Sequence, residues 1–170
     1  MSLQVPQPVV ARVHGLATAA GCQLVATCDL AVASSGAGFA APGGQGGWFC
    51  HTPLVAIGRT IARKQAMELA LSGDRIDAAT ALSWGLVNAV VPPEELDEAV
   101  AALLMRVTRG SAQSKAIGKR TLYVQLSMPQ QEAYGYATDV MARTSQSADA
   151  QEGMRAFLEK RPPRWCDSTD

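Results

Sequence analysis

The residues with the clearest capacity for chemistry lie between positions 13 and 29, where an apolar strand leads through small residues into a helix. Residues 8–13 are rich in β-branched side chains and predict the strand, and residues 19–28 predict a buried helix. The first N–H groups of a helix have no partner inside it and carry partial positive charge. Ala20 and Gly21 therefore predict a backbone site for a negatively charged group. The alternative is that these small residues only allow close packing of helix and sheet.

Two further side chains are candidates for a role at this turn. Gln23 follows the free amides on the same helix end, so it either faces a ligand or is a buried amide that fixes the turn. His51 follows a glycine-rich stretch and could act as an acid or a base, although a packing histidine is the alternative. The stretch 43–47 lacks the Lys-Ser/Thr and the glycine spacing of nucleotide-binding loops, so we do not expect a nucleotide there.

The composition describes a globular chain without a strong charge bias. Its 170 residues suffice for one domain, with 48% hydrophobic and 18% charged residues. Fifteen Lys and Arg balance 15 Asp and Glu, so neither nucleic acid nor an anionic membrane is an expected partner. No apolar run has membrane-spanning length. The four cysteines form no C-x-x-C pair and there are two histidines, so we expect no metal site. Three of the four cysteines have apolar neighbours in the sequence, which is typical of a reducing compartment.

The order of elements predicts a mixed first half and a helical second half. Strands are expected at 30–33, 39–42 and 86–91, and helices at 53–57, 61–71 (capped by Thr60), 78–84, 94–108, 112–127, 130–147 and 150–160. We therefore divide the chain into an α/β core that contains the turn before residue 20, residues 4–92, and a helical region, residues 93–161. Residues 1–3 are interpreted as a cloning remnant.

Four separated motifs, in the right order, resemble the crotonase superfamily of enoyl-CoA hydratases and isomerases. They are the turn and helix at 13–29, Leu-Ser-Gly-Asp-Arg-Ile-Asp-Ala at 71–78, Trp-Gly-Leu-Val-Asn-Ala-Val-Val-Pro at 84–92, and Glu-Gly-Met-Arg-Ala-Phe-Leu-Glu-Lys-Arg at 152–161. Within that superfamily, the chain is most similar to the mitochondrial enoyl-CoA hydratase domain-containing group. The resemblance covers nearly the whole chain, with the N-terminal part of the family's module missing.

The resemblance implies the fold, the substrate and the assembly. The fold would be the C-terminal part of the ClpP-like ββα spiral, followed by a helical trimerisation region. The protein would bind an acyl-CoA thioester, with coenzyme A as part of the substrate and no separate cofactor, and form a homotrimer or a dimer of trimers. The backbone at Ala20, with Gly21, would be the oxyanion hole that stabilises the enolate. Phe157 and Lys160 would contact the CoA adenine and phosphates, unless their helix simply packs on the body.

The chain departs from the family at both catalytic carboxylates. Gln23 and Gly43 stand where hydratases carry two glutamates, and neither residue exchanges protons near neutral pH. We therefore expect isomerisation, slow hydration or another enolate chemistry, in a protein that would be classed as an enoyl-CoA hydratase/isomerase of fatty acid metabolism. The alternative is a non-catalytic member that binds acyl-CoA or assembles with active relatives. The expected location is the cytoplasm of a bacterium or the mitochondrion of a eukaryote.

Overall fold

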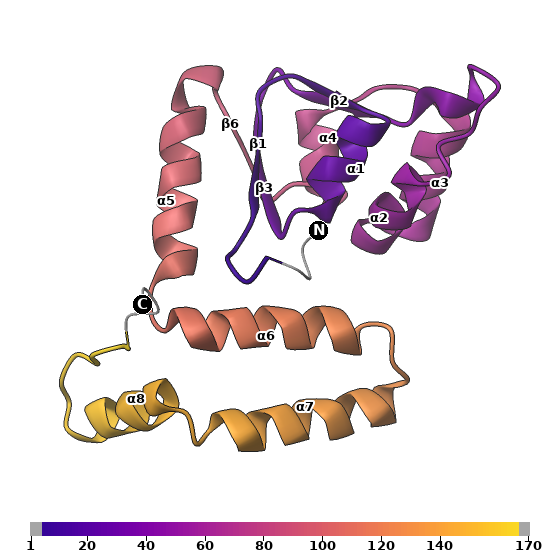
Figure 1. Cartoon of the computed structure of the whole chain (residues 1–170). Coiled ribbons are helices and arrows are strands. Elements are labelled where there is room, and N and C mark those ends of the chain that lie inside the picture. The colour runs from indigo at the N-terminus through magenta and orange to yellow at the C-terminus, as the bar shows by residue number, and fades with distance from the viewer. Residues whose placement is uncertain (1–4, 167–170) are drawn as a thin grey trace. The chain divides into compact units, whose positions relative to one another are not determined.

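The computed structural model describes residues 5–166 and separates them into two compact units (Figure 1). One unit, the core unit, comprises residues 9–106. The other, the helical unit, comprises residues 5–8 and 107–166. Residues 1–3, interpreted above as a cloning remnant, lie outside the described part of the chain. None of the helices in residues 5–166 has both the length and the apolar character needed to cross a membrane.

The core unit contains two small sheets. In the first, β1 (Val10–Val13), β3 (Leu30–Ser34) and β6 (Ala89–Val91) run parallel in the order β1-β3-β6. In the second, β2 (Leu16–Thr18) pairs in parallel with β4 (Gly38–Ala40), which pairs antiparallel with β5 (Ile76–Asp77). The small residues at 16–18 predict a turn, but Leu16–Thr18 is a strand that pairs with Gly38–Ala40. Local propensity does not reveal this strand, because its ladder partner lies more than 20 residues away.

Helices cover these sheets. They are α1 (Ala20–Thr27), α2 (Pro53–Thr60), α3 (Arg63–Ser72), α4 (Ala78–Ser83) and α5 (Leu96–Thr108), with short 3₁₀ turns η2 (Pro42–Gly44) and η3 (Pro93–Glu95). Asp77 caps α4, since its carboxylate accepts a hydrogen bond from Thr80 N–H at 2.7 Å. Thr60 does not cap α3. Its hydroxyl donates to the carbonyls of Ala26 and Ala56, so it ends α2 instead.

The core unit buries its apolar side chains in one cluster. Phe39 on β4, Ile57 on α2 and Leu69 on α3 are at most 1% exposed, and they share this cluster with residues of every sheet. The cluster fixes β4 and α1, and thereby the turn that joins β2 to α1. These elements confirm the predicted mixed α/β class.

The helical unit consists of α6 (Ala112–Gln125), α7 (Gln130–Thr144) and α8 (Ala148–Leu158), close to the predicted helices (Figure 1). Ser111 and Ser147 cap α6 and α8 through hydrogen bonds from Ser114 N–H and Ala150 N–H. The Ser111 hydroxyl also donates to the buried carboxylate of Asp149 at 2.5 Å. The unit is therefore held at α8 by a polar contact as well as by packing.

Candidate active site

The candidate site lies at the edge of the second sheet where β2 and β4 both end. Because the two strands are parallel, their carboxyl ends meet at this edge, which is where ligands bind in many parallel sheets. Ala19 N–H donates to the Ala40 carbonyl at 2.9 Å, and this bond joins the two strand ends. The chain then enters α1 on one side and η2 on the other.

A strained alanine starts α1. Ala19 has φ 47° and ψ −111°, a conformation that residues with a side chain rarely adopt. Gln23 N–H donates to the Ala19 carbonyl at 3.0 Å, which is the first hydrogen bond of the helix. The amides of Ala20, Gly21 and Cys22 therefore precede the helical ladder. A Cβ added to Gly21 would meet no atom within 4 Å, so there is open space beside these donors.

Gln23 lies partly buried on the first turn of α1. In the part of the chain that the structure describes, its hydrogen bonds use its backbone: the N–H bonds Ala19, and the carbonyl accepts from the Thr27 hydroxyl at 2.7 Å. The carboxamide thus does not hold the turn through a bond to the described residues. That the Gln23 carboxamide faces a ligand stays a prediction.

Gly43 has no room for a side chain. An added Cβ would lie 2.3 Å from the Trp48 carbonyl oxygen and 2.8 Å from Cys50 Sγ. The Gly43 carbonyl itself accepts hydrogen bonds from Gly46 N–H and Trp48 N–H, which closes the loop around it. A glutamate at this position would require the loop to be rebuilt. The glycine is thus a packing requirement of this loop.

Few groups at this edge can exchange protons. Residues 19–23 and 41–51 contain no aspartate or glutamate. Burial, together with the neighbouring Cys50, raises the pKa of the Cys22 thiol to about 12, so Cys22 stays protonated. His51 is exposed just before α2, with its ring 5.3 Å from that of Phe49. The role of His51 as an acid or a base stays a prediction. Residues 5–166 hold no cluster of three potential metal ligands.

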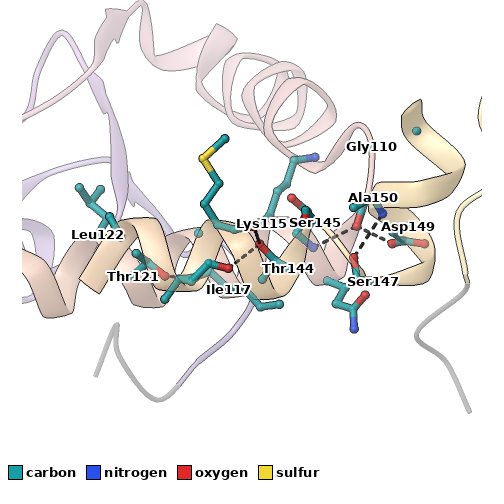
Figure 2. A pocket seen from close by; sticks show the side chains of 18 of the residues that line it. Gly110, Lys115, Ile117, Thr121, Leu122, Thr144, Ser145, Ser147, Asp149 and Ala150 are labelled. Atoms are coloured by element: carbon teal, nitrogen blue, oxygen red, sulfur yellow. Dashed lines mark hydrogen bonds between the residues drawn. The ribbon is translucent and has the colours of Figure 1, made fainter. Parts of the chain in front are cut away.

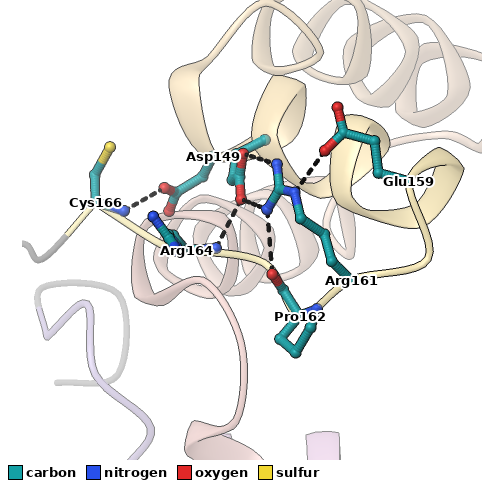
Figure 3. A network of polar contacts seen from close by, with 7 residues as sticks. Asp149, Glu159, Arg161, Pro162, Arg164 and Cys166 are labelled. Atoms are coloured by element: carbon teal, nitrogen blue, oxygen red, sulfur yellow. Dashed lines mark hydrogen bonds and ion pairs between the residues drawn. The ribbon is translucent and has the colours of Figure 1, made fainter.

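The predicted CoA contacts belong to the helical unit. Phe157 is 82% exposed near the end of α8, and Lys160 is exposed just after it with φ 54°. The neighbouring Arg161 is engaged elsewhere, since its guanidinium binds both carboxylate oxygens of Glu152, at 2.6 and 3.0 Å, and also Glu159 (Figure 3). Phe157 and Lys160 are thus free to meet a ligand from solvent, while Arg161 holds the chain to α8.

Comparisons with known proteins agree with this architecture. The enoyl-CoA hydratase/isomerase family model matches residues 2–168. Enoyl-CoA hydratase domain-containing protein 3, mitochondrial, from Danio rerio is 47% identical over 97% of this chain and 57% of its own length. The Homo sapiens protein of the same name is 45% identical over 94% of this chain and 53% of its own. The chain thus spans about half the length of the curated relatives it matches.

Solved structures give the same result. An enoyl-CoA hydratase from Mycobacterium smegmatis superposes with a TM-score of 0.93 at 45% identity, over 96% of this chain and 63% of that one. Human enoyl Coenzyme A hydratase domain-containing protein 3 superposes with a TM-score of 0.91 at 45% identity, over 96% and 64% of the two chains. The fold is that of the crotonases, and the chain belongs to the enoyl-CoA hydratase/isomerase family.

Proposed function

We propose that the chain binds an acyl-CoA thioester and stabilises its enolate through the backbone N–H of Ala20, supported by that of Gly21. The observation that carries the proposal is the strained turn at Ala19, which presents these amides beside open space at the strand edge. Family membership supports the choice of an acyl thioester as ligand. A fixed donor aimed at a developing oxyanion is typically worth about 3–4 kcal/mol of barrier.

The reaction at this site would proceed without the usual carboxylate pair. Gln23 can orient a carbonyl or a water molecule by hydrogen bonds but cannot exchange a proton, and the loop at Gly43 excludes a second acid–base side chain. We expect enolate formation, in which the proton passes to solvent because neither Gln23 nor Gly43 can accept it, to be seen as exchange or isomerisation and to be faster than addition of water. Binding of acyl-CoA without turnover is the second candidate, and the closed loop at Gly43 favours it.

We further propose that Phe157 stacks on the CoA adenine and that Lys160 pairs with its phosphates. Both side chains are exposed on one helix end, and an aromatic ring with a cation suits such a ligand. The relatives above are named as mitochondrial, and for a eukaryotic source we propose that compartment.

We also propose that the helical unit assembles copies of the chain into a trimer or a dimer of trimers. Neither α6 nor α7 contains a fully buried residue. An assembly face would consist of exposed apolar side chains of this unit: Leu126, Tyr134 and Leu158. Light scattering on the eluting protein should give at least three times the chain mass of 17.9 kDa. A stable monomer would contradict this assembly.

The catalytic proposal can be tested with crotonyl-CoA in D₂O, followed by mass spectrometry. Incorporation of deuterium without a gain of water is the expected result. Rapid gain of water would contradict the expectation that hydration is slow, and would direct attention to His51. If crotonyl-CoA binds but remains unchanged, the second candidate is correct. If it does not bind, both candidates fail.

A variant can then ask whether Gln23 limits the reaction. Gln23→Glu restores one carboxylate beside the Ala20 amide and should raise hydration at least tenfold. Gly43→Glu is unsuitable as a second substitution, because the Trp48 carbonyl occupies the space that its Cβ would need. Gln65→Glu is the matched control: Gln65 Oε1 accepts from Ala62 N–H at the start of α3, and a carboxylate can accept the same bond. The control should leave hydration unchanged.

A further inference from the structure

The helical unit contains an open groove between α6, α7 and α8 (Figure 2). Its volume is about 870 Å³, within the range of pockets that bind small organic ligands. Most of its walls are apolar, formed among others by Ile117 and Leu122 of α6, Val140 and Met141 of α7, and Met154 of α8. The groove therefore suits a ligand with a hydrocarbon body.

Three hydroxyl groups in the groove donate to backbone carbonyls. Thr121 donates to the Ile117 carbonyl at 2.8 Å and Thr144 to the Val140 carbonyl at 2.9 Å. Ser145, labelled with Thr121 and Thr144 in Figure 2, donates to the Ala142 carbonyl at 2.8 Å. At one end, the Asp149 carboxylate is also occupied, since it accepts from the Ser111 hydroxyl and from Cys166 N–H. A ligand therefore does not need to form hydrogen bonds with these groups.

Lys115 is the exception. Its Nζ is buried and has no hydrogen-bond partner among the described residues. The ammonium group lies near Gly110, where an added Cβ would be 3.7 Å from Nζ. An ammonium that is removed from water without a partner is costly, and its place near the start of α6 adds the positive end of the helix dipole. A single anionic group in the groove would pair with the ammonium and would also be stabilised by the positive end of the helix dipole.

We propose that this groove binds a medium-chain aliphatic carboxylate, with the carboxylate paired to Lys115 and the chain lying along α6 toward Leu122. One buried ammonium without a hydrogen-bond partner among the described residues matches one negative charge on an apolar chain. Lys115 and Leu122 are seven residues apart, about 10 Å along the helix, and the ammonium lies on the far side of Lys115, near Gly110. A chain of about ten carbons or more is therefore needed to reach Leu122. Met141 and Met154 can adapt to such a chain.

The proposal does not depend on the thioester site, since neither the turn at residues 19–23 nor Phe157 or Lys160 lines the groove. It also uses none of the three side chains assigned above to the assembly face. The groove could instead receive an acidic side chain of a second copy, and the experiment below separates the two cases.

The test is calorimetric titration of the full chain with decanoate, decan-1-ol and decyltrimethylammonium. Decanoate should bind at least tenfold more tightly than either of the other two. Lys115→Met keeps the length of the side chain and removes its charge, and should weaken decanoate at least tenfold while the affinity for decanol stays the same or rises. Lys64→Met, on the exposed surface of α3, is the matched control and should change neither affinity.

A second variant tests the groove itself. A side chain at Gly118 would enter open space, because an added Cβ meets no atom within 4 Å, and Gly118 lines the groove on α6. Gly118→Leu should therefore fold and should abolish binding of both decanoate and decanol. Equal affinities for decanoate and decyltrimethylammonium, or unchanged decanoate binding in Lys115→Met, would overturn the proposal. So would a Lys115→Met protein that changes its oligomeric mass while its decanoate affinity stays the same.

Discussion

The core unit and the helical unit bury different kinds of groups. Nearly all buried apolar residues of the described chain lie in residues 9–106, and Ala156 is the one that lies in the helical unit. The other fully buried residues of the helical unit, Ser111 and Asp149, are polar and bonded to each other. The core unit therefore holds itself together by hydrophobic burial, whereas the helical unit relies on a few polar contacts and leaves several large apolar side chains exposed.

This difference assigns separate tasks to the units. A close-packed core can hold a strained alanine and a crowded glycine in place, which the proposed oxyanion site requires. Helices without buried residues can instead meet ligands or other chains. The following predictions test this division, from the largest expected effect to the smallest.

The largest effect should come from the core of the first unit. Phe39 is fully buried, so Phe39→Ala should lower the free energy of unfolding by about 3–5 kcal/mol. Leu126 of the helical unit is 66% exposed, so Leu126→Ala should cost little in dilute protein and more at high concentration, where copies assemble. Urea titrations at two protein concentrations measure both. If both variants lowered the free energy of unfolding by the same amount, hydrophobic burial would not distinguish the core unit from the helical unit.

A pair of glycines tests the crowding at the site. Gly43→Ala places a Cβ against the Trp48 carbonyl and should destabilise the core unit by roughly 1–3 kcal/mol. Gly58→Ala, in α2 with open space around it, should stabilise by about 0.5–1 kcal/mol. Thermal unfolding followed by circular dichroism compares them. A Gly43→Ala protein as stable as the parent would mean that the loop can open for a side chain.

The smallest effect concerns the end of α8. The ion pair with Arg161, assisted by Arg164 N–H, lowers the pKa of Glu152 from 4.5 to about 2 (Figure 3). The stabilisation is therefore fully present above pH 4.5 and is lost as the pH falls toward 2. Glu152→Gln should lower the melting temperature by a few degrees at pH 7, with the difference vanishing near pH 2. Glu132→Gln, exposed on α7, is the control and should show no such pH dependence.

The sequence predicts the helices and their caps more accurately than it predicts contacts between distant segments. Asp77 as the cap of α4 follows from local residue chemistry. Leu16–Thr18 could not be recognised as a strand, because its pairing with Gly38–Ala40 is a long-range property. The sequence predicts that Thr60 caps the helix that follows it, and this prediction is wrong. The Thr60 hydroxyl donates to the Ala26 carbonyl of α1, 34 residues earlier, a contact that the local sequence does not reveal.

In the candidate site, too, residues that adjoin one another in the sequence could be predicted, whereas features that depend on packing could not. Ala20, Gly21 and Gln23 could be found because they adjoin one another at a single helix start. The sequence shows that Gly43 lacks a side chain, but it does not show that the Trp48 carbonyl excludes one. Lys115 gives no sequence signal, because burial of its ammonium group depends on how the chain packs around Gly110.

The most direct test of the central claim is to delete one N–H at the site. Cys22 directly follows Gly21, so a synthetic peptide of residues 1–21 can be ligated to residues 22–170, with lactate in place of Ala20. The ester removes this N–H and leaves the side chain. Exchange of the α-protons of butyryl-CoA in D₂O should fall by about 10²–10³ relative to the ligated all-amide protein, with butyryl-CoA still bound. Equal exchange rates in the two proteins would contradict a role for the Ala20 amide.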